Sequence, residues 1–203
     1  MARDRAARPG AKPLRLFVAI DVPPAARDAV AAAIEPWRAE LPKIRWAPPE
    51  SWHVTVKFLG WTYPRLFEWV HTRVRVVAGG VPAFRTRLTG LGRFPASGRA
   101  RVLWAGLDDE RGTMAGVASA MDVALAEEFE PEKRDFRAHL TVARSNPPVA
   151  LPAGFAETPV EPVTFRVDHV TLYRSHLQRP AARYEPLEVV RLAGPLRGPA
   201  SAR

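Results

Sequence analysis

The sequence contains no cysteine among its 203 residues. This absence excludes disulfide bonds, thiolate zinc sites and cysteine nucleophiles, and it suits a reducing compartment, so we expect a cytoplasmic protein. Long apolar runs are also lacking, since none approaches the ~18–20 residues that span a membrane. The first twelve residues are rich in arginine and lack the apolar segment of a secretory signal. We therefore expect neither a membrane anchor nor a membrane partner.

Acidic residues are outnumbered by basic ones, 21 to 30, which gives a net charge of +9. A field of that sign favours phosphate-bearing partners such as nucleic acid. The alternative is compositional bias, because alanine, arginine and proline are abundant along the whole chain. Charge alone does not decide between these interpretations.

The remaining composition is that of a globular protein, with 47% hydrophobic and 25% charged residues. Hydrophobic periodicity and turn residues predict three helices, at 25–41, 64–78 and 111–129. They predict strands at 14–22, 53–58, 83–94, 101–108, 136–144, 163–175 and 183–192. The strand at 136–144 is expected to stop at the sequence SNPP. Because strands mostly neighbour strands, the order predicts an α+β fold with antiparallel sheets, built as two similar halves.

The predicted domain organisation is simple. We expect a basic tail at 1–13, one two-lobed domain at 14–192 and a C-terminal tail at 193–203. Nothing in the sequence demands more than a monomer.

The pattern His-x-Thr-x occurs three times, at 53–56, 139–142 and 169–172. On a strand, His53 and Thr55 share one face, with ~6.5–7 Å between their Cα atoms, and the same parity joins His139 to Thr141. An imidazole can give or take a proton near neutral pH, and a threonine hydroxyl can donate to a phosphate oxygen. Two such strands that face each other would hold an acid, a base and two hydroxyls, which suits in-line cleavage of a phosphoester without a metal. A single copy is more often an ordinary half-exposed strand face.

The chain resembles the two-histidine phosphoesterase superfamily, and within it the RNA 2′,3′-cyclic phosphodiesterases, also called 2′-5′ RNA ligases. The resemblance runs from about Arg15 to Leu187. It rests on RLFVAI, WHVTVKFLG, LTGLGRFPASGRARVLWAGL, FRAHLTVAR and VTLYRS.

The resemblance implies a two-lobed α+β fold with pseudo-twofold symmetry and one motif from each lobe in a central cleft. It also implies that an RNA 2′,3′-cyclic phosphate end is opened to a 2′-phosphate, without metal or cofactor. His53 would then be the proton donor to the leaving 3′ oxygen and His139 the base that activates water, while Thr55 and Thr141 hold the phosphate. Ala138 stands where these proteins usually have proline, a residue that would stiffen the strand entry.

Several other residues are candidates for binding the phosphate or the rest of the substrate. Lys57 shares the parity of His53 and could face the phosphate, or it could be an ordinary surface lysine. Arg144 could clamp phosphate, although strand parity points it away from the cleft. The remaining candidates for substrate contact are Tyr173 and Ser175 as cleft neighbours, and Phe17, Trp46 and Trp52 as stacking residues. For each of the three stacking candidates, a place in the core is the more common role of such a residue.

The other three histidines are not assigned to catalysis. His169 lies in the second half of the sequence together with His139, whereas a symmetric cleft needs one histidine from each half. We expect His169 to be a bystander or to act through another residue. His71 and His176 are expected at the surface.

Three other functions remain open. One is a phosphodiesterase acting on a smaller cyclic nucleotide such as an ADP-ribose derivative, and another is the reverse reaction that joins 2′-5′ ends. The third is a non-catalytic RNA-binding module. A metallohydrolase is disfavoured, because His-x-Thr lacks the carboxylate or cysteine clustering of metal sites.

Overall fold

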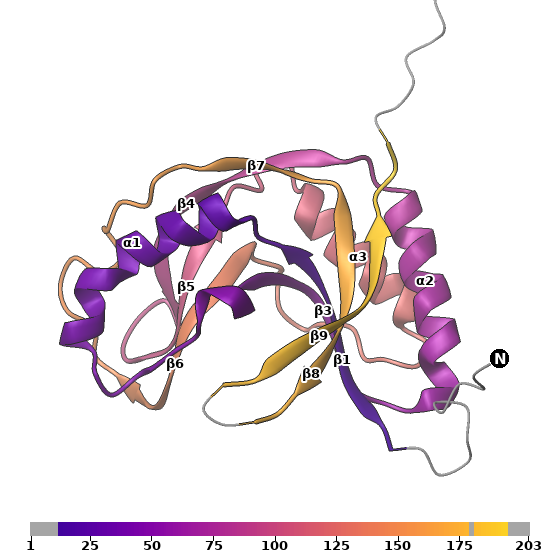
Figure 1. Ribbon diagram of the computed structural model, residues 1–203, viewed down its shortest axis with the longest axis horizontal. Helices are drawn as coiled ribbons and strands as arrows, with labels where there is room; N and C mark the ends of the chain where they lie inside the picture. Colours follow the sequence, from indigo (N-terminus) through magenta and orange to yellow (C-terminus); the bar gives the residue numbers. More distant parts are fainter. Residues whose placement is uncertain (1–11, 179–180, 195–203) are drawn as a thin grey trace, which may run out of the picture.

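The computed structural model describes residues 12–178 and 181–194. The predicted tails at 1–13 and 193–203 therefore lie outside the described residues, apart from 12–13 and 193–194. The helices are α1 (Pro24–Glu40), α2 (Phe67–Gly79) and α3 (Thr113–Leu125), with short 3-10 turns η2 (Pro49–Ser51) and η3 (Pro64–Leu66). The strands are β1 (Leu14–Asp21), β2 (Arg45–Trp46), β3 (His53–Thr62), β4 (Phe84–Phe94), β5 (Ala100–Leu107), β6 (His139–Val149), β7 (Thr164–Val167), β8 (His169–His176) and β9 (Arg183–Arg191) (Figure 1).

The strands form one antiparallel sheet in the order β7-β4-β5-β6-β3-β1-β8-β9, with β2 added beside β6. Two groups of four strands meet where β6 lies next to β3, and these are the strands that carry the first two His-x-Thr motifs. The two groups define the lobes: β3, β1, β8 and β9 form lobe one, and β6, β5, β4 and β7 form lobe two. The α+β fold with antiparallel strands and two lobes, predicted from the sequence, is confirmed.

The contact between the lobes is a single antiparallel pair, Val54 opposite Leu140. In an antiparallel ladder this register sets His53 beside Thr141 and Thr55 beside His139. The two motifs therefore face each other head to tail, about a pseudo-twofold axis that passes between Val54 and Leu140.

The sheet is curled, which corrects the prediction of one strand at 163–175. The segment forms two strands, β7 and β8, with only Asp168 between them. β7 pairs with β4 at one edge of the sheet, whereas β8 pairs with β1 close to the other edge. A single residue spans only about 3.8 Å, so the sheet must bend until its two ends approach each other.

A second correction concerns the expected end of the strand at SNPP. β6 continues through Pro147 and Pro148 to Val149, which pairs with Ala100 of β5. A register shift precedes this pair, and prolines are tolerated at such irregularities because a bulged residue does not need to donate to the ladder.

Both motif strands contain the same β-bulge directly after the threonine. Ala19 pairs with Thr55 and Val18 with Lys57, so Val56 is an extra residue in β3. In β6 the corresponding extra residue is Val142. The first six residues of both strands consequently share one burial pattern. Half-buried and buried side chains alternate up to the threonine, and two buried residues then follow in succession.

The bulge turns Lys57 away from the cleft, contrary to the sequence-based expectation. Its side chain is 1% exposed, forms an ion pair with Asp122 of α3 at 2.5 Å, and donates a hydrogen bond to the carbonyl of Glu130 at 2.7 Å. Lys57 thus ties the first motif strand to the helix that covers it.

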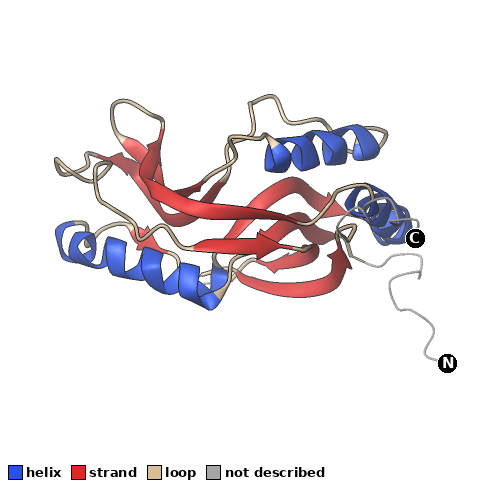
Figure 2. Cartoon of the chain, turned by 90° about the horizontal axis from the view of Figure 1, so that it is seen from above, coloured by secondary structure: helices blue, strands red, loops and turns tan. Residues whose placement is uncertain are grey.

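The helices lie outside the sheet (Figure 2). α2 and α3 contact each other and cover lobe one, where α3 packs on β3 and α2 on β9. α1 lies at the other end of the molecule, where its Trp37 packs against Phe155 and donates a hydrogen bond to Thr158. No helix in the described part of the chain is long and apolar enough to cross a membrane.

Replacing Lys57 tests the link between β3 and α3. We expect Lys57→Met to lower the free energy of unfolding by about 3 kcal/mol, because it leaves Asp122 without its cation. Urea unfolding followed by circular dichroism measures this loss. The double variant Lys57→Met/Asp122→Leu should recover much of it, whereas equal stability of Lys57→Met and the unaltered protein would contradict the assignment.

Candidate active site

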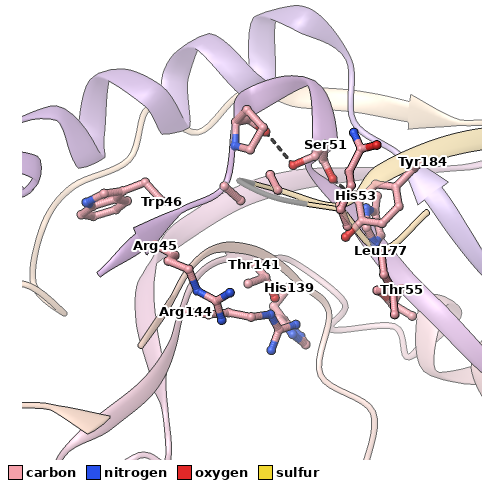
Figure 3. Close-up of a pocket in the computed structure, with 15 residues that line it drawn as sticks. Arg45, Trp46, Ser51, His53, Thr55, His139, Thr141, Arg144, Leu177 and Tyr184 are labelled. Carbon is pink, nitrogen blue, oxygen red and sulfur yellow. Dashed lines mark hydrogen bonds between the residues drawn. The ribbon is translucent and has the colours of Figure 1, made fainter. Parts of the chain in front are cut away.

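The two motifs open into one pocket of about 350 Å³ at the junction of the lobes (Figure 3). His53 and Thr55 enter it from β3, and His139 and Thr141 from β6. The rest of the lining comes from β2, the η2 turn, β6 and the β8–β9 hairpin: Arg45, Trp46, Ala47, Pro48, Ser51, Arg144, Leu177, Gln178, Ala181, Ala182 and Tyr184.

The two histidines are held in the same way. Nδ1 of His53 lies 2.8 Å from the carbonyl oxygen of Ser51, and Nδ1 of His139 lies 2.7 Å from that of Arg137. A carbonyl oxygen only accepts, so each Nδ1 must donate its proton. Each Nε2 is therefore the nitrogen left for chemistry, an acceptor when the ring is neutral and a donor when it is charged. His139 makes this bond although Ala138 precedes it in place of proline.

Burial lowers the pKa of both rings below the ordinary value of 6.5, and the charge of Arg144 adds to the effect at each. The carbonyl hydrogen bond opposes this shift in both cases. One opposing influence acts on His53 alone: the carboxylate of Asp21, which favours its charged form. The symmetry of the two motifs is therefore broken electrostatically.

Asp21 is held by the third His-x-Thr copy. Asp21 pairs with His53 across the β1–β3 ladder. Its carboxylate accepts hydrogen bonds from His169 Nε2 at 3.0 Å, Thr171 Oγ1 at 2.7 Å and Tyr173 Oη at 2.6 Å. These three residues share one face of β8, so the motif periodicity aligns three donors on one carboxylate. Burial, and then the bond to Asp21, raises the pKa of Tyr173, which keeps its hydroxyl a donor.

His169 itself lies outside the pocket lining, but the argument that it shares a half of the molecule with His139 is wrong. β8 belongs to lobe one, the same lobe as His53, because the chain returns across the sheet after β7. Both ring nitrogens of His169 face carboxylates, Nε2 that of Asp21 and Nδ1 that of Asp168 at 2.7 Å. Neither nitrogen is left to exchange a proton with a substrate.

Arg144 does line the pocket, against the parity argument made from the sequence. The bulge at Val142 restores it to the face of Thr141, and its neighbour across the β2–β6 pair is Arg45. Two guanidinium groups thus stand beside the histidines, and planar guanidinium groups are suited to phosphate oxygens.

Aromatic rings support both imidazoles. The edge of Tyr184 packs against His53, with ring centroids 5.0 Å apart, and Phe94 packs against His139 at 5.1 Å in the same orientation. Phe17 lies 4.7 Å from His53 and is only 3% exposed, so it supports the histidine and offers no free face to a nucleobase. Gly92 is required beside Trp104, which flanks His139, because a Cβ there would lie 2.2 Å from the indole ring.

Of the other residues predicted to contact the substrate, only some line the pocket. Trp46 lines the pocket, whereas Trp52 is buried and donates to the carbonyl of Ala47. Tyr173 and Ser175 do not line this pocket. Tyr173 stacks on Phe17, and Ser175 accepts a hydrogen bond from Arg15.

The two other histidines pair with carboxylates. His71 contacts Glu188 and His176 contacts Glu185. Both contacts lie away from the pocket lining. In residues 12–178 and 181–194, no group of three or more histidine, aspartate or glutamate side chains is arranged to hold a metal ion.

Asp21, Tyr184 and Arg45 were not predicted from the sequence. Asp21 carried a signal, since it is a charged residue at the end of the apolar strand LRLFVAID and shares the parity of Phe17. Tyr184 and Arg45 carried none, because their position depends on the pairing of β9 with β8 and of β2 with β6.

The Asp21 carboxylate can be tested without measuring activity. We expect Asp21→Asn to lower the pKa of His53 further, because the negative charge that favours its imidazolium is removed while the side-chain shape is kept. An NMR titration of the histidine ring protons measures this. His139 is the internal control, since Asp21 does not influence its pKa; equal shifts at both rings, or none at His53, would contradict the argument.

The chain was compared with known proteins. The model of the 2′-5′ RNA ligase superfamily matches residues 26–179. The chain is 30% identical to a protein of Methanothermobacter thermautotrophicus named RNA 2′,3′-cyclic phosphodiesterase, over 88% of this chain and 99% of that protein. It is also 30% identical to a protein of Thermus thermophilus with the same name, over 89% and 91%.

Solved structures are similar as well. A crystal structure of TT0787 from Thermus thermophilus superposes with a TM-score of 0.75 and 25% identity, over 90% of this chain and all of that one. Escherichia coli LigT complexed with 3′-AMP superposes with a TM-score of 0.70 and 25% identity, over 89% and 99%. With two His-x-Thr strands meeting in one pocket and a family model that spans most of the sequence, the chain belongs to the 2′-5′ RNA ligase superfamily.

Proposed function

We propose that the protein hydrolyses RNA ends that carry a 2′,3′-cyclic phosphate and leaves a 2′-phosphate, by acid–base catalysis from two histidines. The observation that carries the proposal is the pair of imidazoles in one pocket. Each donates a hydrogen bond from Nδ1 to a backbone carbonyl, so its Nε2 is available for proton transfer. The names of the relatives, RNA 2′,3′-cyclic phosphodiesterase, support the choice of substrate.

The reaction is an in-line displacement at phosphorus. Nε2 of neutral His139 takes a proton from water as the water oxygen attacks the phosphorus atom. The bond from phosphorus to the 3′ oxygen breaks on the opposite side, and Nε2 of charged His53 donates its proton to that oxygen. The product is a 2′-phosphate beside a free 3′ hydroxyl, and a proton exchange with solvent resets the two rings.

Asp21 supports the choice of His53 as the acid. Sequence alone leaves the two motifs equivalent, whereas only His53 has a carboxylate that favours its imidazolium form. Arg144 opposes a positive charge on both rings, so without Asp21 neither imidazole would be favoured as the proton donor.

The phosphate is bound by neutral and charged donors. Thr55 and Thr141 lie beside the histidines of the opposite strands and can donate to the non-bridging oxygens. Arg144 and Arg45 add positive charge where negative charge develops in the transition state. Neither acid–base step in this scheme requires a metal ion.

Hydrolysis is tested with a short RNA that ends in a 2′,3′-cyclic phosphate, in excess chelator, with the product isomer identified by chromatography. We expect a 2′-phosphate, formed at a rate that chelator does not change. His53→Ala and His139→Ala should each lower kcat by about 10²- to 10⁴-fold, as is typical when a general acid or base is removed. His71→Ala, a histidine on α2 away from the pocket, is the matched control and should retain the rate.

Other outcomes separate the alternatives. A 3′-phosphate product would contradict the direction of cleavage. Turnover of a small cyclic nucleotide but not of RNA would favour the smaller substrate, and joining of 2′-5′ ends under the same conditions would favour ligation.

The pH dependence follows from the two lowered pKa values. His139 must be neutral, so kcat/KM rises as the pH increases through the pKa of His139, which lies below 6.5. His53 must be charged, so kcat/KM falls as the pH increases through the pKa of His53, which also lies below 6.5. We therefore expect a bell-shaped profile of kcat/KM with its maximum below pH 6.5. A maximum above pH 7 would contradict the lowered pKa values of the two rings.

A further inference from the structure

A second pocket of about 320 Å³ adjoins the first on lobe one. The two pockets share Leu177 and Gln178, which follow β8 at the tip of the β8–β9 hairpin. The other lining residues are Pro13, Leu14, Arg15, Trp61, Arg174, Ser175 and His176. A volume of this size falls within the range of small-ligand sites, roughly 300–1,000 Å³.

Two exposed aromatic rings lie on the sheet face that leads from the first pocket to the second. Across the β1–β3 ladder, Phe17 pairs with Phe58 and Arg15 with Trp61, so Phe58 and Trp61 share the face of Phe17, which contacts His53. Phe58 is 40% and Trp61 62% exposed, whereas Phe17 is buried. Core packing explains Phe17 but not these two rings.

The β-bulges of β3 create this arrangement. The bulge at Val56 returns Phe58 to the cleft face, and a second register shift at Leu59 returns Trp61 to it. Phe58 occupies the place in β3 that Arg144 occupies in β6, three residues after the motif threonine. Lobe one therefore presents an aromatic ring where lobe two presents a guanidinium group.

The pocket is also positively charged. The guanidinium group of Arg15 lies 4.4 Å above the ring of Phe58, and its Nη1 donates to Ser175 at 3.1 Å. No carboxylate lies within ion-pair distance of Arg15 among the described residues. Arg174 and His176 both lie beside the carboxylate of Glu185, at 3.8 and 2.6 Å, so the positive charge that this pocket offers to a ligand is that of Arg15.

Taken with the proposed function, on which this inference rests, these features indicate a nucleic-acid strand as the occupant. Proteins bind single strands by stacking bases on aromatic rings that are interleaved with arginine. We propose that the second pocket binds the nucleotide that precedes the RNA end, with its base on Trp61 and its phosphate at Arg15, whose guanidinium group rests on the ring of Phe58. Such a site would make the protein prefer an RNA strand over a single cyclic nucleotide.

The test compares two substrates that end in the same nucleotide: a mononucleoside 2′,3′-cyclic phosphate and a hexanucleotide with a 2′,3′-cyclic phosphate end. We expect Trp61→Ala to lower kcat/KM for the hexanucleotide by about 5- to 150-fold, the effect of removing one stacking ring, and to leave the mononucleotide value unchanged. Arg15→Gln should also affect only the hexanucleotide. It should reduce the slope of log kcat/KM against log salt concentration by about 0.7, the value for one phosphate contact on a single strand.

Matched controls lie on α2, which covers the other face of lobe one. Val76→Ala removes an exposed apolar side chain and Arg73→Gln an exposed arginine. Both should leave the two kcat/KM values as they are.

Equal losses on both substrates in Trp61→Ala, or no loss on the hexanucleotide, would overturn the second site. If the unaltered protein hydrolyses neither substrate, the proposed function fails instead. Binding then decides the inference by itself: fluorescence anisotropy of a 5′-labelled hexanucleotide with a 2′-phosphate end should show weaker binding to Trp61→Ala than to Val76→Ala. Equal dissociation constants for these two variants would overturn it.

Discussion

The structure depends on one antiparallel contact, the pairing of Val54 with Leu140 where the two lobes meet. Both side chains are buried, so the register is held by the core, and a slip by one residue would turn each motif to the wrong face of its strand. With this register, each histidine lies beside the threonine of the other strand. Both lobes contribute to the pocket, since neither lobe alone holds both imidazoles. Any change that separates β3 from β6 therefore alters the spacing of the two histidines and the two threonines together.

The bulge that follows each threonine is the second constraint. It gives β3 and β6 the same backbone course, although the side chains that follow the bulge differ. Val56 and Val142 occupy the extra positions, and the next residue in each strand points into the core: Lys57 toward α3 in lobe one, Ala143 in lobe two. The residue after that returns to the sheet face of the motif threonine, where Phe58 and Arg144 differ completely in character. The backbone symmetry is thus retained while the side chains have diverged. The divergence places Arg144 of the pocket in lobe two, and the exposed aromatic rings in lobe one.

The two imidazoles are distinguished electrostatically by a part of the sheet that does not line the pocket. The third His-x-Thr copy donates two hydrogen bonds to Asp21 and the following Tyr173 a third, and the carboxylate held in this way lies next to His53 in the ladder. In lobe two, no carboxylate acts in this way on His139, whose pKa responds to burial, to the Arg137 carbonyl and to Arg144. A motif that the sequence presents as a third candidate for catalysis therefore serves, in the structure, to position a charge.

The sequence by itself determined the α+β character and the faces shared by His53 with Thr55 and by His139 with Thr141. Such features follow from side-chain alternation and composition, which are local. The sequence's choice of these two histidines over His71 and His176 as catalytic groups stays a prediction. Only the tertiary structure decided the placement of Lys57 and Arg144, because a bulge is fixed by the register of the neighbouring strand and reverses the parity that the sequence suggests. It also divided 163–175 into two strands at opposite ends of a curled sheet, and it brought Asp21 and Tyr184 to His53. These contacts join strands that lie far apart along the chain, and no local pattern encodes such pairings.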